Sequence, residues 1–498
     1  MNVNPITRLD YPDPDVIRVE DTYYMVSTTM HFMPGCEILQ SFDLVHWEHV
    51  TYVYETLDHT DAQQLKSGQN IYGQGMWAAS LRYHEGRFCI CFVANDTRKT
   101  YLYTSEKIDG PWKKQLIEGF YHDGSLLFDE DGRNYIVYGN DEIWITELNE
   151  DLTAPKKGGL HRLLVSDHKN PELGYEGSHI QKINGYYYIF LVHSLRDRWM
   201  RTEACFYSDS LEGEFTGGDV LCDDRGYCGQ GVAQGGIVDT PDGKWYAMLF
   251  QDSGAVGRIP ILLPVTWKDH FPFFGQNGHV PEEIEVHSTR PGYIYQPLVG
   301  SDDFCNGLLP RWQFNHDPDP RYYHLDALQG TYTITTREVC TELTQAVNTL
   351  TQRMSYPSCA AEVTVDASAL KEGDVAGLCA LQSCYAAVGI TKHHGKYEVL
   401  MLDKKEDGIL DMTEGTAVES HQMDFRLEAD FCNMKDEARC YYRVNKGDWL
   451  PIGTVHKLYF KLDHFTGCRF GLFCYAAEET GGSACFRDFK YYDVDEIS

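Results

Sequence analysis

The chain has 498 residues, a length that indicates two domains, and its 43% hydrophobic content is typical of a globular protein with a full core. Its net charge of -31 excludes nucleic acids and anionic membrane surfaces as natural partners, because both would repel it. No apolar run is long enough to span a membrane, and residues 1–5 lack the features of a secretory signal. We therefore predict a cytoplasmic protein with a small-molecule substrate. Assembly into a homo-oligomer stays open.

The first informative segment is the pentad of residues 11–15, with the sequence Tyr-Pro-Asp-Pro-Asp, which precedes a hydrophobic run. Pro12 and Pro14 restrict the backbone on both sides of Asp13, so this carboxylate would be held where a strand begins. A general base needs such placement, because its reach to a proton must be set in advance. The alternative is an ordinary turn that uses Asp and Pro for their turn preferences.

A short pattern then recurs along the first half of the chain: a turn with an acid or Asn, usually followed by Gly, and then an aromatic-rich strand. Each copy is a hairpin signal. Repeats of this length built from short strands are typical of propeller blades, and five copies predict a five-bladed β-propeller over residues 1–298. The copies begin at Glu20, Glu85, Asp131, Asn184 and Asp242.

Each copy follows a segment that would form the innermost strand of its blade. If the blades are equivalent, the leading residues of these segments all project into one central funnel. A funnel that receives three carboxylates, an indole and an amide is typical of an active site. The alternative is that acids stand at strand starts because they tolerate turns. The leading residues are Asp13, Trp77, Asp123, Glu176 and Gln234.

The second half, residues 299–498, changes to short alternating strands separated by turns, which predicts an antiparallel β-sandwich. We find no catalytic constellation in it; His393 and His394 stand beside Gly395 in a predicted hairpin turn. The 16 cysteines are scattered over the chain and indicate reduced core thiols, not a disulfide framework or a zinc site.

Together these segments resemble glycoside hydrolase family 43, of the β-xylosidase and α-L-arabinofuranosidase type. The resemblance rests on Tyr11 to Pro14, on residues 34–47, on Tyr175-Glu176-Gly177, on Gly254 to Arg258 and on Trp312 to His316. It implies an all-β fold, with a five-bladed β-propeller followed by a concanavalin-like antiparallel β-sandwich. Any one of these motifs alone is weak, but their order along the chain is specific.

The resemblance also implies roles for single residues. Asp13 would be the general base and Glu176 the general acid, while Asp123 would orient the acid and raise its pKa. Trp77 and Arg258 match positions that contact the terminal sugar. We add Gln234 and Met30 to the predicted substrate-binding set.

The fifth blade departs from the family pattern. Many members carry a His that joins a hydrated calcium site where this chain has Gln234. An amide oxygen can ligate calcium, but it is a poorer determinant of such a site. We therefore predict that catalysis requires no cofactor and no metal, while calcium binding at the centre of the propeller stays open.

The predicted activity is the exo-acting removal of terminal β-1,4-linked xylose from xylo-oligosaccharides. In an inverting mechanism the two catalytic carboxyl groups stand roughly 6.5–9.5 Å apart. The alternative is an α-L-arabinofuranosidase, or an enzyme with both activities. Two further classes, a carbohydrate-binding propeller without catalysis and a protein-interaction propeller, are less consistent with three acids around one funnel.

Overall fold

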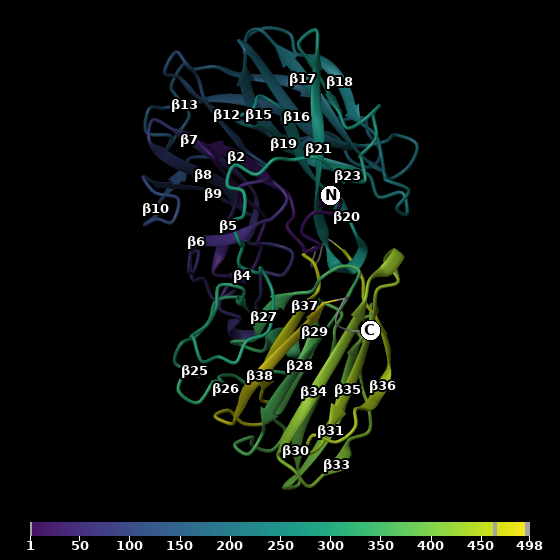
Figure 1. The fold of residues 1–498 in the computed structure, drawn as a ribbon. Coiled ribbons are helices and arrows are strands. Elements are labelled where there is room, and N and C mark those ends of the chain that lie inside the picture. The colour runs from purple at the N-terminus through teal and green to yellow at the C-terminus, as the bar shows by residue number, and fades with distance from the viewer. Residues whose placement is uncertain (1, 462–465, 494–498) are drawn as a thin grey trace.

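The computed structural model describes residues 2–461 and 466–493. Its two halves are both built from antiparallel strands, with the propeller in purple to teal at the top of Figure 1 and the sandwich in green to yellow below it. This confirms the predicted architecture. The short 3-10 turns of the described residues are η1 (Lys66–Gly68), η2 (Gly254–Val256), η3 (Leu343–Gln345) and η4 (Cys432–Met434). No helix among them is long and apolar enough to cross a membrane.

Within the described residues, five four-stranded sheets form the blades. Every predicted turn lies between the first and second strands of its blade, as the repeat requires. The blades are, in order, β2 (Asp15–Val19), β3 (Thr22–Val26), β5 (Gly35–Ser41) and β6 (Glu48–Tyr54); β7 (Met76–His84), β8 (Arg87–Ala94), β9 (Lys99–Ser105) and β10 (Lys113–Ile117); β11 (Ser125–Phe128), β12 (Asn134–Asn140), β13 (Glu142–Leu148) and β14 (His161–Ser166); β15 (Glu176–Ile183), β16 (Tyr186–Ser194), β17 (Arg201–Ser208) and β18 (Thr216–Leu221); β19 (Val232–Asp239), β20 (Trp245–Asp252), β21 (Arg258–Lys268) and β22 (Phe271–Phe274).

The blades form a closed ring. The inner strands β2, β7, β11, β15 and β19 each contact the next, and β19 contacts β2. In the part of the chain that the structure describes, the last blade takes no strand from the N-terminal segment. Closure comes instead from β1 (Asn2–Val3), which pairs with β23 (Glu283–Ile284), and from the amide of Asn4, which donates to the Leu262 carbonyl at 2.8 Å.

Hydrophobic side chains from facing sheets fill the spaces between neighbouring blades. Ile38 of the first blade and Leu81 and Phe92 of the second are fully buried in one such cluster, for example. Burial of this kind supplies the main favourable free energy of a β-fold, because each alternate side chain leaves water.

Arg82 crosses the axis of the ring. Its guanidinium donates to the Asp15 carboxylate at 2.7 Å, to the Ser125 hydroxyl at 2.7 Å and to the carbonyls of Leu126 at 2.9 Å and Ile180 at 3.2 Å. These partners come from the inner strands of three other blades. One side chain therefore joins four inner strands that form no backbone ladder with one another.

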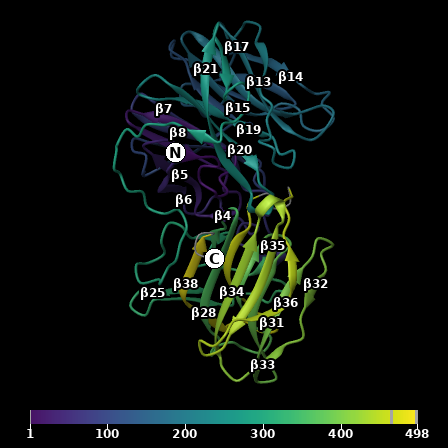
Figure 2. The same ribbon diagram turned by 45° about the vertical axis from the view of Figure 1, so that its right-hand side comes forward.

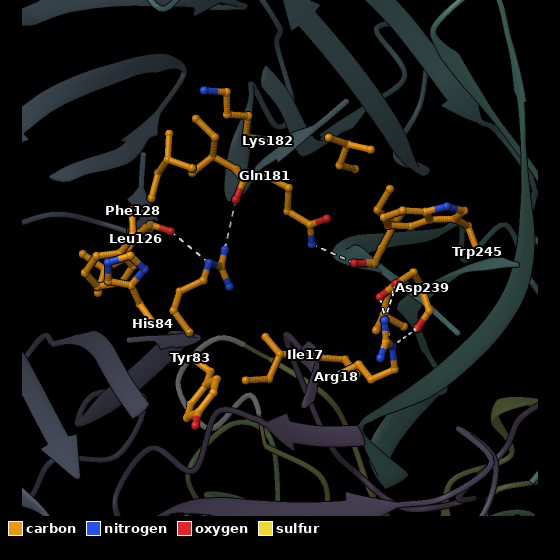
Figure 3. A pocket seen from close by; sticks show the side chains of 17 residues that line it. Ile17, Arg18, Tyr83, His84, Leu126, Phe128, Gln181, Lys182, Asp239 and Trp245 are labelled. Carbon is orange, nitrogen blue, oxygen red and sulfur yellow. Dashed lines mark hydrogen bonds and ion pairs between the residues drawn. The ribbon is translucent and has the colours of Figure 1, made fainter. Parts of the chain in front are cut away.

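A pocket of about 410 Å³ opens at one end of the ring (Figure 3). It is lined by the later residues of the inner strands, such as Arg18, His84, Phe128 and Asp239. The leading residues of these strands lie at the opposite end. This pocket is therefore remote from the predicted catalytic carboxylates.

The second half packs two sheets around a large core that includes Phe425, Phe470 and Phe486. One sheet has the order β32 (Leu410–Met412), β31 (Lys396–Lys404), β30 (Ala386–His393), β29 (Val375–Leu381), β37 (Arg469–Tyr475), β27 (Leu350–Arg353), β24 (Gln313–Asn315) and β4 (Phe32–Met33), with β33 (Thr416–Val418) beside β31. The other has the order β25 (Tyr323–Asp326), β26 (Thr331–Thr335), β38 (Ser483–Asp493), β28 (Ser358–Asp366), β34 (Gln422–Asp430), β35 (Glu437–Arg443) and β36 (Leu450–Lys457). All 16 cysteines are free thiols.

The two halves share a sheet. Strand β4 comes from the first blade segment but pairs with β24 of the sandwich, with Met33 opposite Phe314 and Phe32 opposite Asn315. In Figures 1 and 2, β4 lies where the propeller meets the sandwich. The predicted division between residues 298 and 299 stays a prediction, but the chain before it contributes a strand to the sheet that follows.

Candidate active site

Four of the leading residues stand two positions before regular pairing of their inner strand begins, whereas Glu176 stands one position further back: these four are Asp13, Trp77, Asp123 and Gln234. Asp13, Asp123 and Gln234 have positive φ angles of 51°, 46° and 62°, and Glu176 is followed by Gly177 at 66°. Bulges interrupt β7, β15 and β19 at the same level, just after Met76, Glu176 and Ala233. Such bulges redirect side chains, so the local backbone turns these residues toward the axis.

Asp13 is almost fully buried and is held by two donors. The Thr28 hydroxyl donates to its Oδ2 at 2.6 Å, and the Arg258 guanidinium donates to its Oδ1 at 2.8 Å. Both contacts fix the position of the carboxylate, as the role of a general base requires.

Asp123 and Glu176 lie together beside a histidine that the sequence analysis did not single out. His122 Nε2 is 3.6 Å from Asp123 Oδ2 and 3.5 Å from Glu176 Oε2. The Gly177 N–H donates to Asp123 at 3.1 Å, and the Asn140 amide donates to Glu176 at 2.7 Å. In the sequence His122 comes directly before the predicted acid Asp123. Its place beside that acid could therefore have identified it as a candidate site residue.

The pKa shifts of this group follow from burial and from charge. Burial disfavours the charged form of His122. The negative charge of Asp123 and contact with Glu176 outweigh this effect and raise the pKa of His122 to about 9. Burial raises the pKa of Asp123 to about 6, although His122 opposes the shift. Burial acts on Glu176 in the same direction, but contact with His122 and the charge of Arg201 place its pKa below the usual value. The direction of the Glu176 pKa shift is therefore opposite to the predicted one, because His122 outweighs burial.

The other predicted substrate contacts lie around these acids. The half-buried Trp77 stands edge-on to His122, with ring centroids 5.8 Å apart. Gln234 packs so closely on Gly177 that a methyl group there would lie 2.7 Å from its Cγ. Met30 is fully buried, and its backbone exchanges hydrogen bonds with Met76 beside Trp77.

Arg258 belongs to a buried charge network that the sequence showed only in part. Its Nε donates to Asp252 Oδ1 at 3.2 Å, and Asp252 also pairs with Arg201. Burial and the charge of Arg258 lower the pKa of Arg201 to about 9. Asp252 ends β20 and Arg201 begins β17, so both reach the funnel only once the blades are assembled.

The sandwich reaches this end of the propeller. The ring centroid of Phe460 lies 5.9 Å from the Arg258 guanidinium, and that of Phe250, in the propeller, lies 4.7 Å from the same group. An aromatic side chain from the second half therefore stands beside a residue of the predicted sugar site.

Gln234, where the fifth blade departs from the family pattern, makes a hydrogen bond through its backbone: its N–H donates to the buried Glu203 carboxylate at 2.7 Å.

A separate group, His122, Asp123 and Glu176, brings one nitrogen and two oxygens within 4.8 Å of one another. A protonated His122 offers an N–H and no lone pair at Nε2, so we interpret this group as a proton-transfer site. The prediction that no metal is needed stays a prediction.

Each half of the chain matches a known protein family or domain. Residues 3–272 match the model of glycosyl hydrolases family 43, and residues 301–492 match that of the β-xylosidase C-terminal concanavalin A-like domain. The chain is 26% identical to a β-xylosidase of Formosa agariphila, over 99% of this chain and 89% of that one. It is 27% identical to a xylosidase/arabinosidase of Humicola insolens, over 98% and 96%.

A solved structure gives the same result. A bifunctional GH43-CE protein of Bacteroides eggerthii superposes with a TM-score of 0.92 at 42% identity, covering 99% of this chain. The chain spans 63% of that protein's length. The predicted family is thus confirmed by sequence and by fold: the chain belongs to glycosyl hydrolase family 43.

Proposed function

We propose that this glycoside hydrolase removes terminal xylose from β-1,4-linked xylo-oligosaccharides with inversion of configuration. The observation that carries the proposal is the division of the acids between two environments. Asp13 is paired with the fixed cation Arg258, whereas Asp123 and Glu176 surround the titratable His122. Inverting glycoside hydrolysis needs one carboxylate that accepts a proton from water and one carboxyl group that delivers a proton to the leaving oxygen. The titratable imidazole beside Glu176 can supply the proton that Glu176 delivers.

In the proposed mechanism Asp13 takes a proton from water, and the resulting hydroxide attacks the anomeric carbon. Glu176 gives a proton to the leaving oxygen as the glycosidic bond breaks. Because the pKa of Glu176 is low beside His122, the resting proton of the pair is on the imidazole. It passes from His122 to Glu176 as the leaving oxygen draws on the acid, and solvent returns it to His122.

Exo action is supported by two side chains near the acids. Arg82 joins four inner strands below the leading residues, and Phe460 stands at the side of Arg258. A terminal sugar fits such a funnel better than the middle of a chain does. An α-L-arabinofuranoside is the second candidate substrate, because the Humicola insolens relative is named for both activities.

The test compares nitrophenyl β-D-xyloside, nitrophenyl α-L-arabinofuranoside and xylobiose with the purified chain, following the anomer first released by NMR. We expect turnover of the xyloside and of xylobiose with α-xylose as the first product. Exclusive turnover of the arabinofuranoside would transfer the assignment to the second candidate. If the folded protein cleaves none of the three, the proposal is wrong.

The acid is tested by leaving-group dependence. Glu176→Gln should reduce xylobiose turnover by about 10²–10⁴-fold but affect dinitrophenyl xyloside far less, because that leaving group needs little protonation. Asp13→Asn should reduce both to a similar extent, since water activation is lost in either case. Equal losses for both substrates in Glu176→Gln would contradict its role as proton donor.

A further inference from the structure

The sandwich contacts the propeller at the turn that precedes Arg258. The Cys468 N–H donates to the Ala255 carbonyl at 2.8 Å, and the Gln382 amide donates to the same carbonyl at 3.3 Å. Ala255 and Val256 are fully buried and belong to the hydrophobic core of the sandwich. The segment that leads into Arg258 is therefore packed as part of the second half of the chain.

Asp10 stands between this segment and the sandwich. Its carboxylate is 2% exposed and accepts two backbone N–H groups, from Arg258 to Oδ1 and from Gly467 to Oδ2, both at 2.7 Å. One donor belongs to the propeller and the other to the sandwich. A carboxylate has no N–H of its own to repel either donor, so it suits this bridge better than an amide does.

Two glycines allow the approach. A methyl group on Gly257 would lie 2.2 Å from Asp10 Oδ1, and one on Gly467 would lie 2.0 Å from the Val256 carbonyl oxygen and 2.8 Å from Asp10 Cβ. Gly257 also has a φ of 105°, which side-chain-bearing residues rarely adopt. The propeller backbone at Gly257 and the sandwich backbone at Gly467 therefore both pack directly against Asp10, with no room for a side chain at either glycine.

The backbone of Asp10 is fixed from the sandwich as well. Arg353 of β27 donates through Nε to the Asp10 carbonyl at 2.9 Å and pairs with the buried Glu37 at 2.9 Å. The next residue, Tyr11, donates its N–H to the Arg258 carbonyl at 3.0 Å. Asp10 and Tyr11 thus hold Arg258 through both of its backbone polar groups.

We propose that Asp10 is a positioning residue through which the sandwich sets the place of Arg258 and, through it, of the base Asp13. The contacts form one continuous series: Gly467 N–H to Asp10, Asp10 to the Arg258 N–H, and the Arg258 guanidinium to Asp13 at 2.8 Å. The inference rests on the proposed function, which makes Asp13 the base. It assigns the second half of the chain a part in catalysis without placing Asp10 in contact with substrate.

Misplacement of a catalytic group by about 1 Å costs on the order of 10²-fold in rate. In Asp10→Asn one of the two N–H donors faces an NH₂ group, so the Arg258 or the Gly467 contact is lost. We expect kcat on nitrophenyl xyloside to fall by about 10–100-fold. We expect the melting curve to keep its cooperative form.

A double-mutant cycle separates positioning from general stabilisation. If Asp10 acts through Arg258, then Asp10→Asn should lower kcat by less than about threefold in an Arg258→Ala background. The same 10–100-fold loss in both backgrounds would overturn the proposal. Gly467→Ala, which crowds the same contact from the sandwich side, should also lose its effect in the Arg258→Ala background, and it serves where Asp10→Asn does not fold.

A second readout does not depend on turnover. Amide hydrogen exchange of a peptide covering residues 254–260 should become faster in Asp10→Asn than in the parent protein. The control is Asp302→Asn, because Asp302 is also buried, at 5% exposed, and accepts N–H bonds from Phe304 and Trp312 inside the sandwich. Unchanged exchange at residues 254–260 in Asp10→Asn would contradict the proposal even if the wild-type substrate proves to be different.

Discussion

Three carboxylic acids of this site have different roles available to them because their neighbours differ. Asp13 faces the permanent charge of Arg258, which no change of pH in the working range removes. Asp123 and Glu176 face His122, whose charge does depend on pH. The acid side of the site can therefore take up and release a proton through His122.

His122→Asn should move the basic limb of the pH profile of kcat/KM to lower pH. In the parent enzyme the His122 and Glu176 pair keeps its last proton until the pKa of His122, at about 9, is passed. Without the imidazole, Glu176 must hold the proton alone, and it gives it up earlier as the pH rises. The measurement is kcat/KM for xylobiose between pH 5 and 10.

The control for this variant is His421→Asn, because His421 also contacts an acid, Asp366 at 3.1 Å, but lies in the sandwich. It should leave the basic limb in place. A basic limb that is the same in His122→Asn and in the parent would show that Glu176 alone carries the catalytic proton.

The sequence predicted residues that repeat, and it missed residues that meet only in the folded chain. Asp13 and Asp123 could be predicted because equivalent blades place equivalent residues together, and Glu176 because it stands one residue before the equivalent position of its own blade. Asn140 and Arg201 could not be predicted. Asn140 is the last residue of the second strand of its blade and Arg201 is the first residue of the third strand of its blade, and the sequence repeat does not mark either position. Their contacts with Glu176 and Asp252 form only when the blades are assembled around the funnel.

At the scale of elements, the inner strands pose a particular problem. Each pairs with its own blade on one side only, and the other edge faces the axis. Unpaired strand edges leave polar groups that must find partners. Arg82 meets this need by donating to two inner-strand carbonyls, those of Leu126 and Ile180, and by neutralising the buried Asp15.

Arg82→Met should lower the free energy of unfolding by about 3–5 kcal/mol, because it leaves a buried carboxylate without its cation. His179, 3.1 Å from Asp15, and the Leu81 N–H, which donates to Asp15 at 2.7 Å, would be the remaining partners. The measurement is the shift in the urea midpoint at pH 7. Arg133→Met removes an exposed pair with Asp131 and should cost less than about 1 kcal/mol. Similar shifts for both variants would contradict the role given to Arg82.

At the scale of the whole molecule, the two halves are joined more closely than the different sequence patterns of the halves indicate. The turn pattern changes after the last blade, so a division near residue 298 is what composition alone indicates. It could not reveal β4, because two residues that pair with β24 leave no periodic signal. Nor could it reveal that Arg469 of the sandwich lies over Phe32 with the guanidinium 3.4 Å from the ring centroid.

These contacts predict that the two halves unfold together on heating, although separate domains commonly give separate transitions. Calorimetry of the parent chain should show one transition. Arg353→Met leaves Glu37, which is 3% exposed, without its cation across the junction, and it should both lower the transition temperature and divide the peak in two. Arg426→Met, which removes a pair with Glu362 inside the sandwich, should lower the temperature without dividing the peak. Two resolved peaks in the parent chain would mean that the shared sheet and the buried pair do not couple the halves.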